Sequence, residues 1–289
     1  MMRRLLTVLA FYIFCLGAPG VSQRVLAEQQ SRLSVQARPF SSVTVQAADG
    51  SSIAAMPFAA AWRFPVRHGG KHGGGATSSK PSPTGVSVLL LYGVLGNATR
   101  SQLNDLSRRL APLWTARLTL LAPAGRSGAV GRVSPLNTGV PGMRWLPFGE
   151  RVAIPSGAVD VHVLPREPDT YTRTLAVVHV KVPYMELGVA YPVAPQAVKT
   201  RAPEVDVLIV DLDQLRADDL SSRTLAMLDP GMAIIIDGAQ RLRQRAELTE
   251  FADRLYELWI DVYTVDSSTP FVVTADSRGV ILPLHGRHA

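Results

Sequence analysis

The most informative stretch of the chain spans residues 205–237 and reads VDVLIVDLDQLRADDLSSRTLAMLDPGMAIIID. It holds two apolar runs, and each run ends in an aspartate, Asp211 or Asp237. Between them, residues 218–228 have the composition of a helix, and residues 229–231 form a Pro-Gly turn. A strand, a helix and a strand joined by short turns make a βαβ unit, so this stretch predicts two parallel strands.

The same pattern extends in both directions from this stretch. Upstream, an apolar strand at 86–92, a helix at 99–114 and a strand at 117–122 predict a second βαβ unit. Downstream, an amphipathic helix at 246–259 precedes strands at 260–265, 270–274 and 280–282. We therefore expect an α/β fold, a doubly wound and mostly parallel sheet with an antiparallel C-terminal strand pair.

The N-terminus predicts export. Arg3 and Arg4 precede a twelve-residue apolar run, and small or apolar residues follow up to Ala27. This order is typical of a secretory signal peptide, and the run is shorter than the about 20 residues of a membrane span. We expect an extracellular or periplasmic protein, with organelle targeting as the alternative because arginines recur in a Ser-rich stretch up to Arg38.

Four segments follow from composition. They are a signal peptide at 1–27, an N-terminal segment with short strands at 28–66, a flexible Gly/Ser/Pro linker at 67–85, and an α/β domain at 86–289. The histidines of the linker, His68 and His72, are weak metal candidates because ordering a glycine-rich loop costs entropy.

Charge and cysteine content exclude several classes of protein. The formal net charge is +7, but no dense Lys/Arg stripe is present, so we expect no nucleic-acid partner. The single cysteine, Cys15, lies inside the predicted signal peptide and excludes a disulfide scaffold and a cysteine-based metal site. We expect no membrane span in the mature chain.

Three loops are candidates for ligand binding because ligands of open parallel sheets lie beyond the carboxyl ends of the strands. The first contains Gly93, Gly96, Asn97 and Thr99, where glycines allow close approach and Asn97 or Thr99 can cap the next helix. The other two carry Asp211 and Asp237, which can bind a divalent cation or cap helices. Residues 97–99, Asn-Ala-Thr, also form an N-glycosylation sequon, and a glycan on Asn97 would block the first loop.

Residues 124–200 are rich in Pro and Gly and allow fewer predictions. Two strands are expected, at 159–163 and 175–182, and they contain His162 and His179. A histidine in a strand is more often a packed or surface residue than a catalyst, because a general base also needs a positioned partner. Neither histidine is therefore assigned a role from the sequence.

The order of these motifs resembles class I S-adenosylmethionine-dependent methyltransferases, most closely the small-molecule O-methyltransferases. The resemblance rests on 86–123 and 203–275, and it implies that S-adenosylmethionine binds at Gly93, Gly96, Asn97 and Thr99. In the metal-dependent branch, Asp211 and Asp237 match two ligands of a divalent cation. The substrate would be a small molecule, and no general base is identified.

The chain departs from that family at the positions that hold the cofactor. Tyr92 stands where an acid usually precedes the loop, and Ala122-Pro123 stand where an acid binds the ribose. Met232 replaces the second glycine of the Pro-Gly-Gly turn, and Gly238 replaces an asparagine. Each lost charge-assisted hydrogen bond is worth about 1.5–3 kcal/mol, so these departures leave both an active methyltransferase and a catalytically inactive relative open.

Two further classes stay open. The first half of the chain also resembles an α/β-hydrolase, but no Gly-x-Ser-x-Gly nucleophile elbow is present. A secreted binding protein without enzymatic activity is the other alternative.

Overall fold

The computed structural model describes eleven ranges of the chain: 30–37, 41–62, 86–95, 98–110, 116–125, 138–165, 173–194, 202–237, 242–266, 269–279 and 281–285. The predicted signal peptide, the linker at 67–85, Gly96, Asn97 and Gly238 lie outside these ranges. No helix among the described residues is long and apolar enough to cross a membrane.

The described strands form two sheets. The first sheet has eight strands in the order β15-β14-β1-β2-β3-β4-β5-β6, and the second has seven in the order β13-β12-β11-β10-β9-β8-β7. The strands of the first sheet are β1 (Ser31–Gln36), β2 (Ser42–Gln46), β3 (Ser52–Pro57), β4 (Val88–Val94), β5 (Leu118–Pro123), β6 (Met143–Trp145), β14 (Phe271–Ala275) and β15 (Ile281–His285). Those of the second are β7 (Arg151–Ile154), β8 (Gly157–Val163), β9 (Thr174–Val182), β10 (Met185–Val193), β11 (Val207–Asp211), β12 (Met232–Ile236) and β13 (Asp261–Val265).

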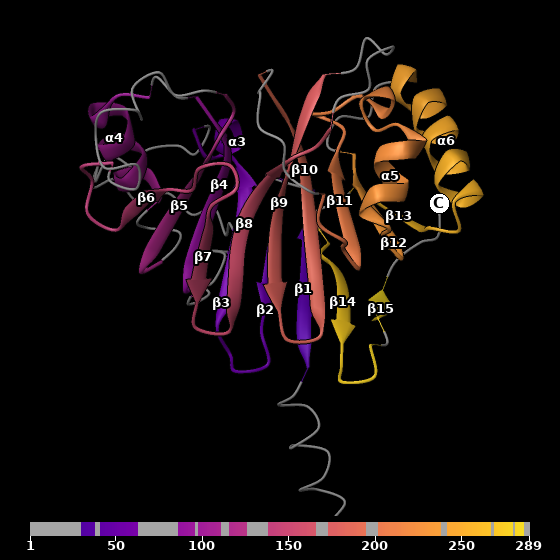
Figure 1. Cartoon of the computed structure of the whole chain (residues 1–289), viewed down its shortest axis with the longest axis horizontal. Helices are drawn as coiled ribbons and strands as arrows, with labels where there is room; N and C mark the ends of the chain where they lie inside the picture. Colours follow the sequence, from indigo (N-terminus) through magenta and orange to yellow (C-terminus); the bar gives the residue numbers. More distant parts are fainter. Residues whose placement is uncertain are drawn as a thin grey trace, which may run out of the picture.

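The helices lie on the outer faces of the two sheets and cover part of each face (Figure 1). They are α3 (Phe58–Trp62), α4 (Arg100–Leu110), α5 (Ser222–Leu228) and α6 (Leu242–Glu257), with a short 3-10 helix at Ala217–Asp219. Helices α3 and α4 lie on the eight-stranded sheet at one side of the molecule, and α5 and α6 lie on the seven-stranded one at the other. The result is a four-layer sandwich of helices, sheet, sheet and helices.

The largest core lies between the two sheets. It contains side chains of both, for example Leu90 and Leu120 from the first sheet and Val178 and Ile234 from the second. The apolar runs of β4, β11 and β12 are buried on both faces, because one face meets the other sheet and the opposite face meets helices. This explains why these strands show no alternation of polar residues in the sequence.

Each sheet combines parallel and antiparallel pairs. In the first, β3, β4, β5 and β6 are parallel, whereas β1 pairs antiparallel with both β2 and β14. In the second, β7 to β10 form an antiparallel meander, and β10 to β13 are parallel. Strands β1 to β3 therefore belong to the same sheet as β4.

The predicted doubly wound sheet is wrong. A doubly wound fold keeps its parallel strands in one sheet with helices on both faces, but here the two predicted βαβ units lie in different sheets. Each sheet has helices on one face only, and its other face is buried against the second sheet.

Candidate metal centre

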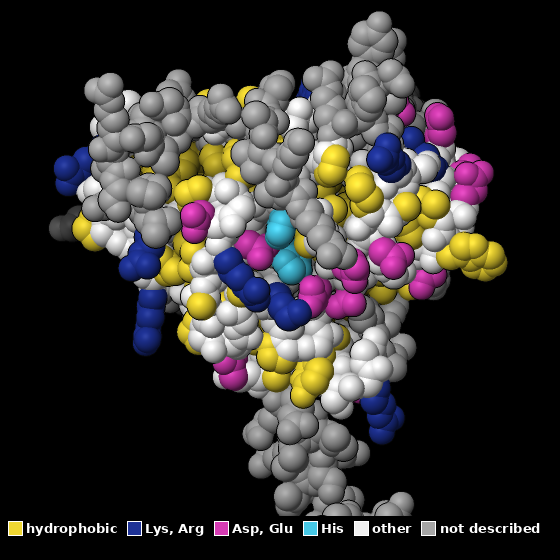
Figure 2. All heavy atoms as spheres, in the orientation of Figure 1, with side chains coloured by type: hydrophobic (Ala, Val, Ile, Leu, Met, Phe, Trp, Pro, Cys, Tyr) yellow, Lys and Arg dark blue, Asp and Glu magenta, His cyan; other side chains and the backbone are white. Residues whose placement is uncertain are grey.

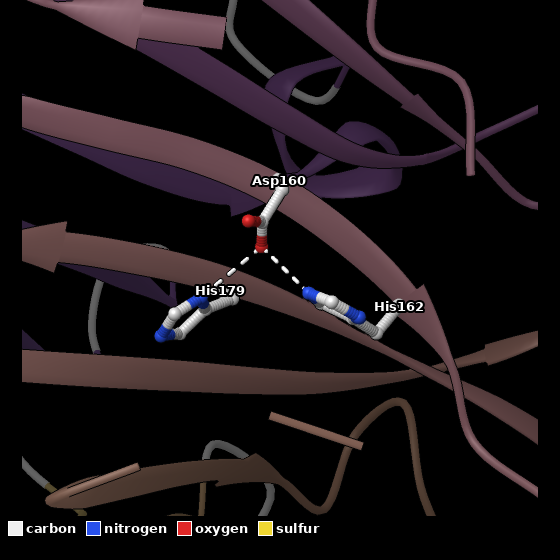
Figure 3. A group of neighbouring side chains, drawn as sticks. All are labelled: Asp160, His162 and His179. Carbon is white, nitrogen blue, oxygen red and sulfur yellow. Dashed lines mark hydrogen bonds and ion pairs between the residues drawn. The ribbon is translucent and has the colours of Figure 1, made fainter. Parts of the chain in front are cut away.

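Three side chains that can bind a metal ion meet on the outer face of the seven-stranded sheet (Figure 3). They are Asp160 and His162 of β8 and His179 of β9, and one donor atom from each lies within 4.8 Å of the others. Strands β8 and β9 pair antiparallel, and Asp160 stands opposite His179. His162 lies two residues along β8 and so faces the same side of the sheet.

The alternation of β8 places these side chains. Val159 and Val161 are fully buried between the two sheets, whereas Asp160 and His162 are only partly buried on the opposite face. In β9, Val178 and Val180 likewise belong to the inner core, which leaves His179 on the outer face. Local alternation therefore selects the face, and the pairing of β8 with β9 selects the neighbours.

The distances within the cluster suit a small cation. Asp160 Oδ1 lies 2.9 Å from His162 Nε2 and 3.1 Å from His179 Nδ1. A tetrahedral Zn²⁺ with bonds of about 2.0–2.1 Å separates its ligand atoms by about 3.3 Å. The donors are therefore already close to the spacing that such an ion requires.

Asp160 is ionised at neutral pH. Burial raises the pKa of its carboxyl group, but hydrogen bonds from His162 and His179 lower it by more, and the net pKa is far below its usual range. A partly buried carboxylate between two imidazoles provides the negative charge that a divalent cation needs.

A second carboxylate fixes the orientation of His179. Glu186 Oε2 lies 3.0 Å from His179 Nε2, so the other ring nitrogen, Nδ1, faces Asp160. Lys181 pairs with Glu186, and the Glu186 backbone N–H donates to Asp206 Oδ2 at 2.7 Å. Burial raises the pKa of Glu186, but Lys181 lowers it by more, so this carboxylate also stays charged. Metal-binding histidines typically have such a carboxylate behind them.

A cleft of about 810 Å³ adjoins the cluster. Lys181 and Glu186 line it, and Glu186 also contacts His179. Figure 2 shows histidine side chains near the centre of this face, between acidic side chains and Lys or Arg side chains. The cluster therefore lies on an open face beside a space large enough for a small ligand.

The loop after β4 is only partly described. Gly93 has a φ of +75°, a conformation that favours glycine, and β4 shifts register against β5 at this point. Thr99 and Gln102 form a reciprocal cap, in which the Gln102 N–H donates to Thr99 Oγ1 and the Thr99 N–H donates to Gln102 Oε1. Because Gly96 and Asn97 lie outside the described ranges, ligand binding and glycosylation at this loop stay predictions.

Asp211 and Asp237 follow the parallel pair β11 and β12, so they lie at the same edge of the seven-stranded sheet. Asp211 Oδ1 accepts a hydrogen bond from the Asp213 N–H at 2.9 Å. Burial raises the pKa of Asp211 to about 6. The charge of Asp211 adds to burial in raising the pKa of Tyr92, which places Asp211 close to the other sheet. The role of Asp211 and Asp237 as metal ligands stays a prediction. Among the described residues, the side chains that lie close enough together to hold a metal ion are those of Asp160, His162 and His179.

Sequence reasoning located both histidines on strands but missed their partner. Asp160 and His162 already form an Asp-x-His pair on one face of a strand. The sequence does not reveal the register of β8 against β9, which places His179 opposite Asp160.

Searches of family models and of curated proteins give no match. Several solved structures are similar in shape. The metallo-beta-lactamase fold protein YhfI from Bacillus subtilis has a TM-score of 0.45 at 10% identity, covering 84% of this chain and 98% of that one. A diphosphatase from the PhnP family has a TM-score of 0.39 at 10% identity, over 84% and 97%. MEM-A1, a subclass B3 metallo-beta-lactamase from a soil metagenome, has a TM-score of 0.29 at 16% identity, over 82% and 87%.

The methyltransferase interpretation is wrong. The loop of Gly93 belongs to one sheet and the acids Asp211 and Asp237 belong to the other, so no single sheet edge carries the proposed cofactor site. The cleft lies instead beside the β9–β10 turn and the residues just before β11, at the opposite end of these strands. The expectations of S-adenosylmethionine binding and of an inactive methyltransferase relative both depend on this interpretation and are wrong with it.

The α/β-hydrolase alternative is wrong for the same reason. That fold places its nucleophile at the top of one sheet, whereas residues 43–50, 86–95 and 118–123 contribute to a sheet that faces a second one. The general expectation of a divalent cation is supported, because Asp160, His162 and His179 form a group that could hold one.

Proposed function

We propose that the protein is a metal-dependent hydrolase whose divalent cation is held by Asp160, His162 and His179. The observation that carries this proposal is the convergence of one carboxylate oxygen and two imidazole nitrogens within 4.8 Å on an open face. The donor types favour Zn²⁺, which binds imidazole nitrogen and carboxylate oxygen and takes four ligands.

Three protein ligands leave one of four positions for water. Structural zinc sites use four protein ligands, whereas catalytic ones use three and keep an open position. When bound at such a site, the cation lowers the pKa of its water to about 7 and supplies a nucleophile at neutral pH. Hydrolysis needs only this nucleophile and a substrate, and no other cofactor.

The residues around the centre have separate tasks in this proposal. Asp160 neutralises charge and stays ionised. Glu186 holds His179 with Nδ1 towards Asp160, and Lys181 holds Glu186. The cleft beside Glu186 gives a substrate access to the centre. The small-molecule substrate expected from the sequence belongs to this proposal.

Calorimetric titration of the metal-depleted full chain with ZnCl₂ tests the metal site. The expected result is binding of one equivalent, which His179→Ala abolishes and His162→Ala weakens by more than about tenfold. His285→Ala, on β15 of the other sheet, is the matched control and binds as the unchanged chain does. Equal affinity in all four proteins would contradict the assignment.

Hydrolysis is tested separately with two chromogenic probes, p-nitrophenyl acetate and bis(p-nitrophenyl) phosphate. We expect turnover that needs Zn²⁺ and is lost in His179→Ala but not in His285→Ala. Stoichiometric binding without turnover of any probe, including the peptides below, would leave a metal site but remove the hydrolase.

A further inference from the structure

We infer that the cleft beside the metal centre binds a short peptide with a free amino group and a free carboxylate. The juxtaposition that leads to this inference is a cationic wall and an acidic wall on opposite sides of one cleft. As a statement about the substrate it rests on the proposed function, but binding itself does not require the metal.

The charges of the cleft are separated along the sheet. Arg151, on β7, lies at one side. Glu204 and Asp206 precede β11 and Asp229 precedes β12, so the acids lie at the other side. The strand order β11-β10-β9-β8-β7 puts three strands between the two walls.

Three of the four charged side chains at the two walls have no partners among the described residues, and the fourth, Asp206, accepts a hydrogen bond from the Glu186 N–H. The Arg151 guanidinium and the carboxylates of Glu204 and Asp229 make no hydrogen bond or ion pair within the described part of the chain. Lys181 and Glu186, which lie between the walls, pair with each other instead. The middle of the cleft is therefore electrically balanced, and its two sides present opposite unpaired charges to a ligand.

The width of the cleft favours a peptide over a free amino acid. From β7 to β11 there are four strand spacings, which amounts to about 19 Å between backbones. A tripeptide extends over about 10 Å at roughly 3.3–3.6 Å per residue, and the long side chains of Arg151 and Glu204 shorten the remaining gap. Glycine alone is too short to contact both walls.

This placement puts the peptide backbone beside the metal centre, on the side of His179 that Glu186 occupies. The Lys181–Glu186 pair lies between the walls, and Glu186 contacts the metal-type ligand His179. In the hydrolysis that follows, the oxygen of water bonds to the carbonyl carbon, the C–N bond breaks, and the leaving nitrogen takes a proton. The products are a carboxylic acid and an amine, with no other co-reactant.

The test is calorimetry of the metal-depleted full chain with triglycine, N-acetyl-triglycine, triglycine amide and glycine. We expect triglycine to bind, and each blocked form and glycine to bind at least about tenfold more weakly, which is the loss of one charge-assisted hydrogen bond. Arg151→Gln should remove the preference for a free carboxylate. The double variant Glu204→Gln/Asp229→Asn should remove the preference for a free amino group.

Two exposed residues outside the cleft provide matched controls, Arg144→Gln on β6 and Glu250→Gln on α6. Equal binding of all four ligands, no binding of triglycine at millimolar concentration, or equal effects of Arg151→Gln and Arg144→Gln would each overturn the inference. Because metal is absent throughout, these results are independent of the zinc titration. If the zinc titration shows no binding and the peptide titration shows the expected preferences, the metal site is contradicted and the peptide-binding cleft is supported.

Discussion

Replacement of Asp211 by asparagine should make the protein more stable at neutral pH, and by an amount that depends on pH. The Asp211 side chain belongs to a residue that is only 1% exposed, and the hydrogen bonds from Asp213 and Ser41 do not offset its burial. Burial is the main cause that raises its pKa to about 6, while the Asp213 N–H opposes this.

The size of the effect follows from the difference between the folded and unfolded pKa. The unfolded value is 3.8 and the folded value about 6, a shift of about 2.2 units, and one unit is worth about 1.36 kcal/mol. Below pH 3.8 the carboxyl is protonated in both states and carries no penalty. As pH rises from 3.8 to 6 the folded state progressively loses stability relative to the unfolded state, and the loss reaches about 3 kcal/mol by pH 7.

Asparagine has nearly the same shape, keeps an oxygen for the Asp213 N–H and cannot ionise. The free energy of unfolding of Asp211→Asn, relative to the unchanged chain, should therefore rise by about 2.4 kcal/mol between pH 4 and pH 7. Urea unfolding followed by tryptophan fluorescence across this range measures it, with Asp253→Asn on the exposed face of α6 as the control. Parallel pH profiles for Asp211→Asn and the unchanged chain would refute the reasoning.

Two further predictions concern the centre and its strands. Glu186→Gln keeps a hydrogen-bonding group near His179 but removes the negative charge behind it. The affinity for zinc should therefore fall by about 10–100-fold in a chelator competition assay, whereas Glu250→Gln should leave it unchanged. An unaltered affinity in Glu186→Gln would show that Glu186 does not support the metal site. Gly157→Ala should lower the free energy of unfolding, measured in urea, by about 3 kcal/mol, because its Cβ would lie 1.9 Å from the Lys181 carbonyl oxygen. Gly231→Ala is the control and should cost less, because its Cβ would meet no atom closer than 3.7 Å. Equal effects would show that β8 and β9 approach each other less closely than the structure has them.

Local elements of the fold could be predicted because they follow from local periodicity. The apolar runs at 86–92 and 207–210 correspond to β4 and β11, and the amphipathic stretch at 246–259 corresponds to α6. Each of these patterns shows which side chains of one helix or strand are buried. The pattern is the same whichever other element buries them.

The arrangement of the sheets could not be predicted, and β10 shows why. Gly188 and Pro192 interrupt its apolar pattern, and both residues usually weaken a strand. In the structure Gly188 leaves room for Val205 and Val177, whose methyl groups would lie 3.0 and 3.1 Å from a Cβ at this position. Strand β10 joins the antiparallel meander to the parallel strands, so missing it made two sheets look like one.

The metal-type cluster depended on the same long-range information. His162 and His179 were visible as strand histidines, but a lone strand histidine predicts packing more often than chemistry. Only the pairing of β8 with β9 shows that His179 shares Asp160 with His162.

X-ray absorption at the zinc edge, on the full chain loaded with one equivalent of Zn²⁺, tests the central claim most directly. We expect two imidazole nitrogens at about 2.0–2.1 Å together with oxygen ligands, and one imidazole fewer in His162→Ala. A spectrum without imidazole scattering, or one that stays the same when both His162 and His179 are replaced by alanine, would contradict it.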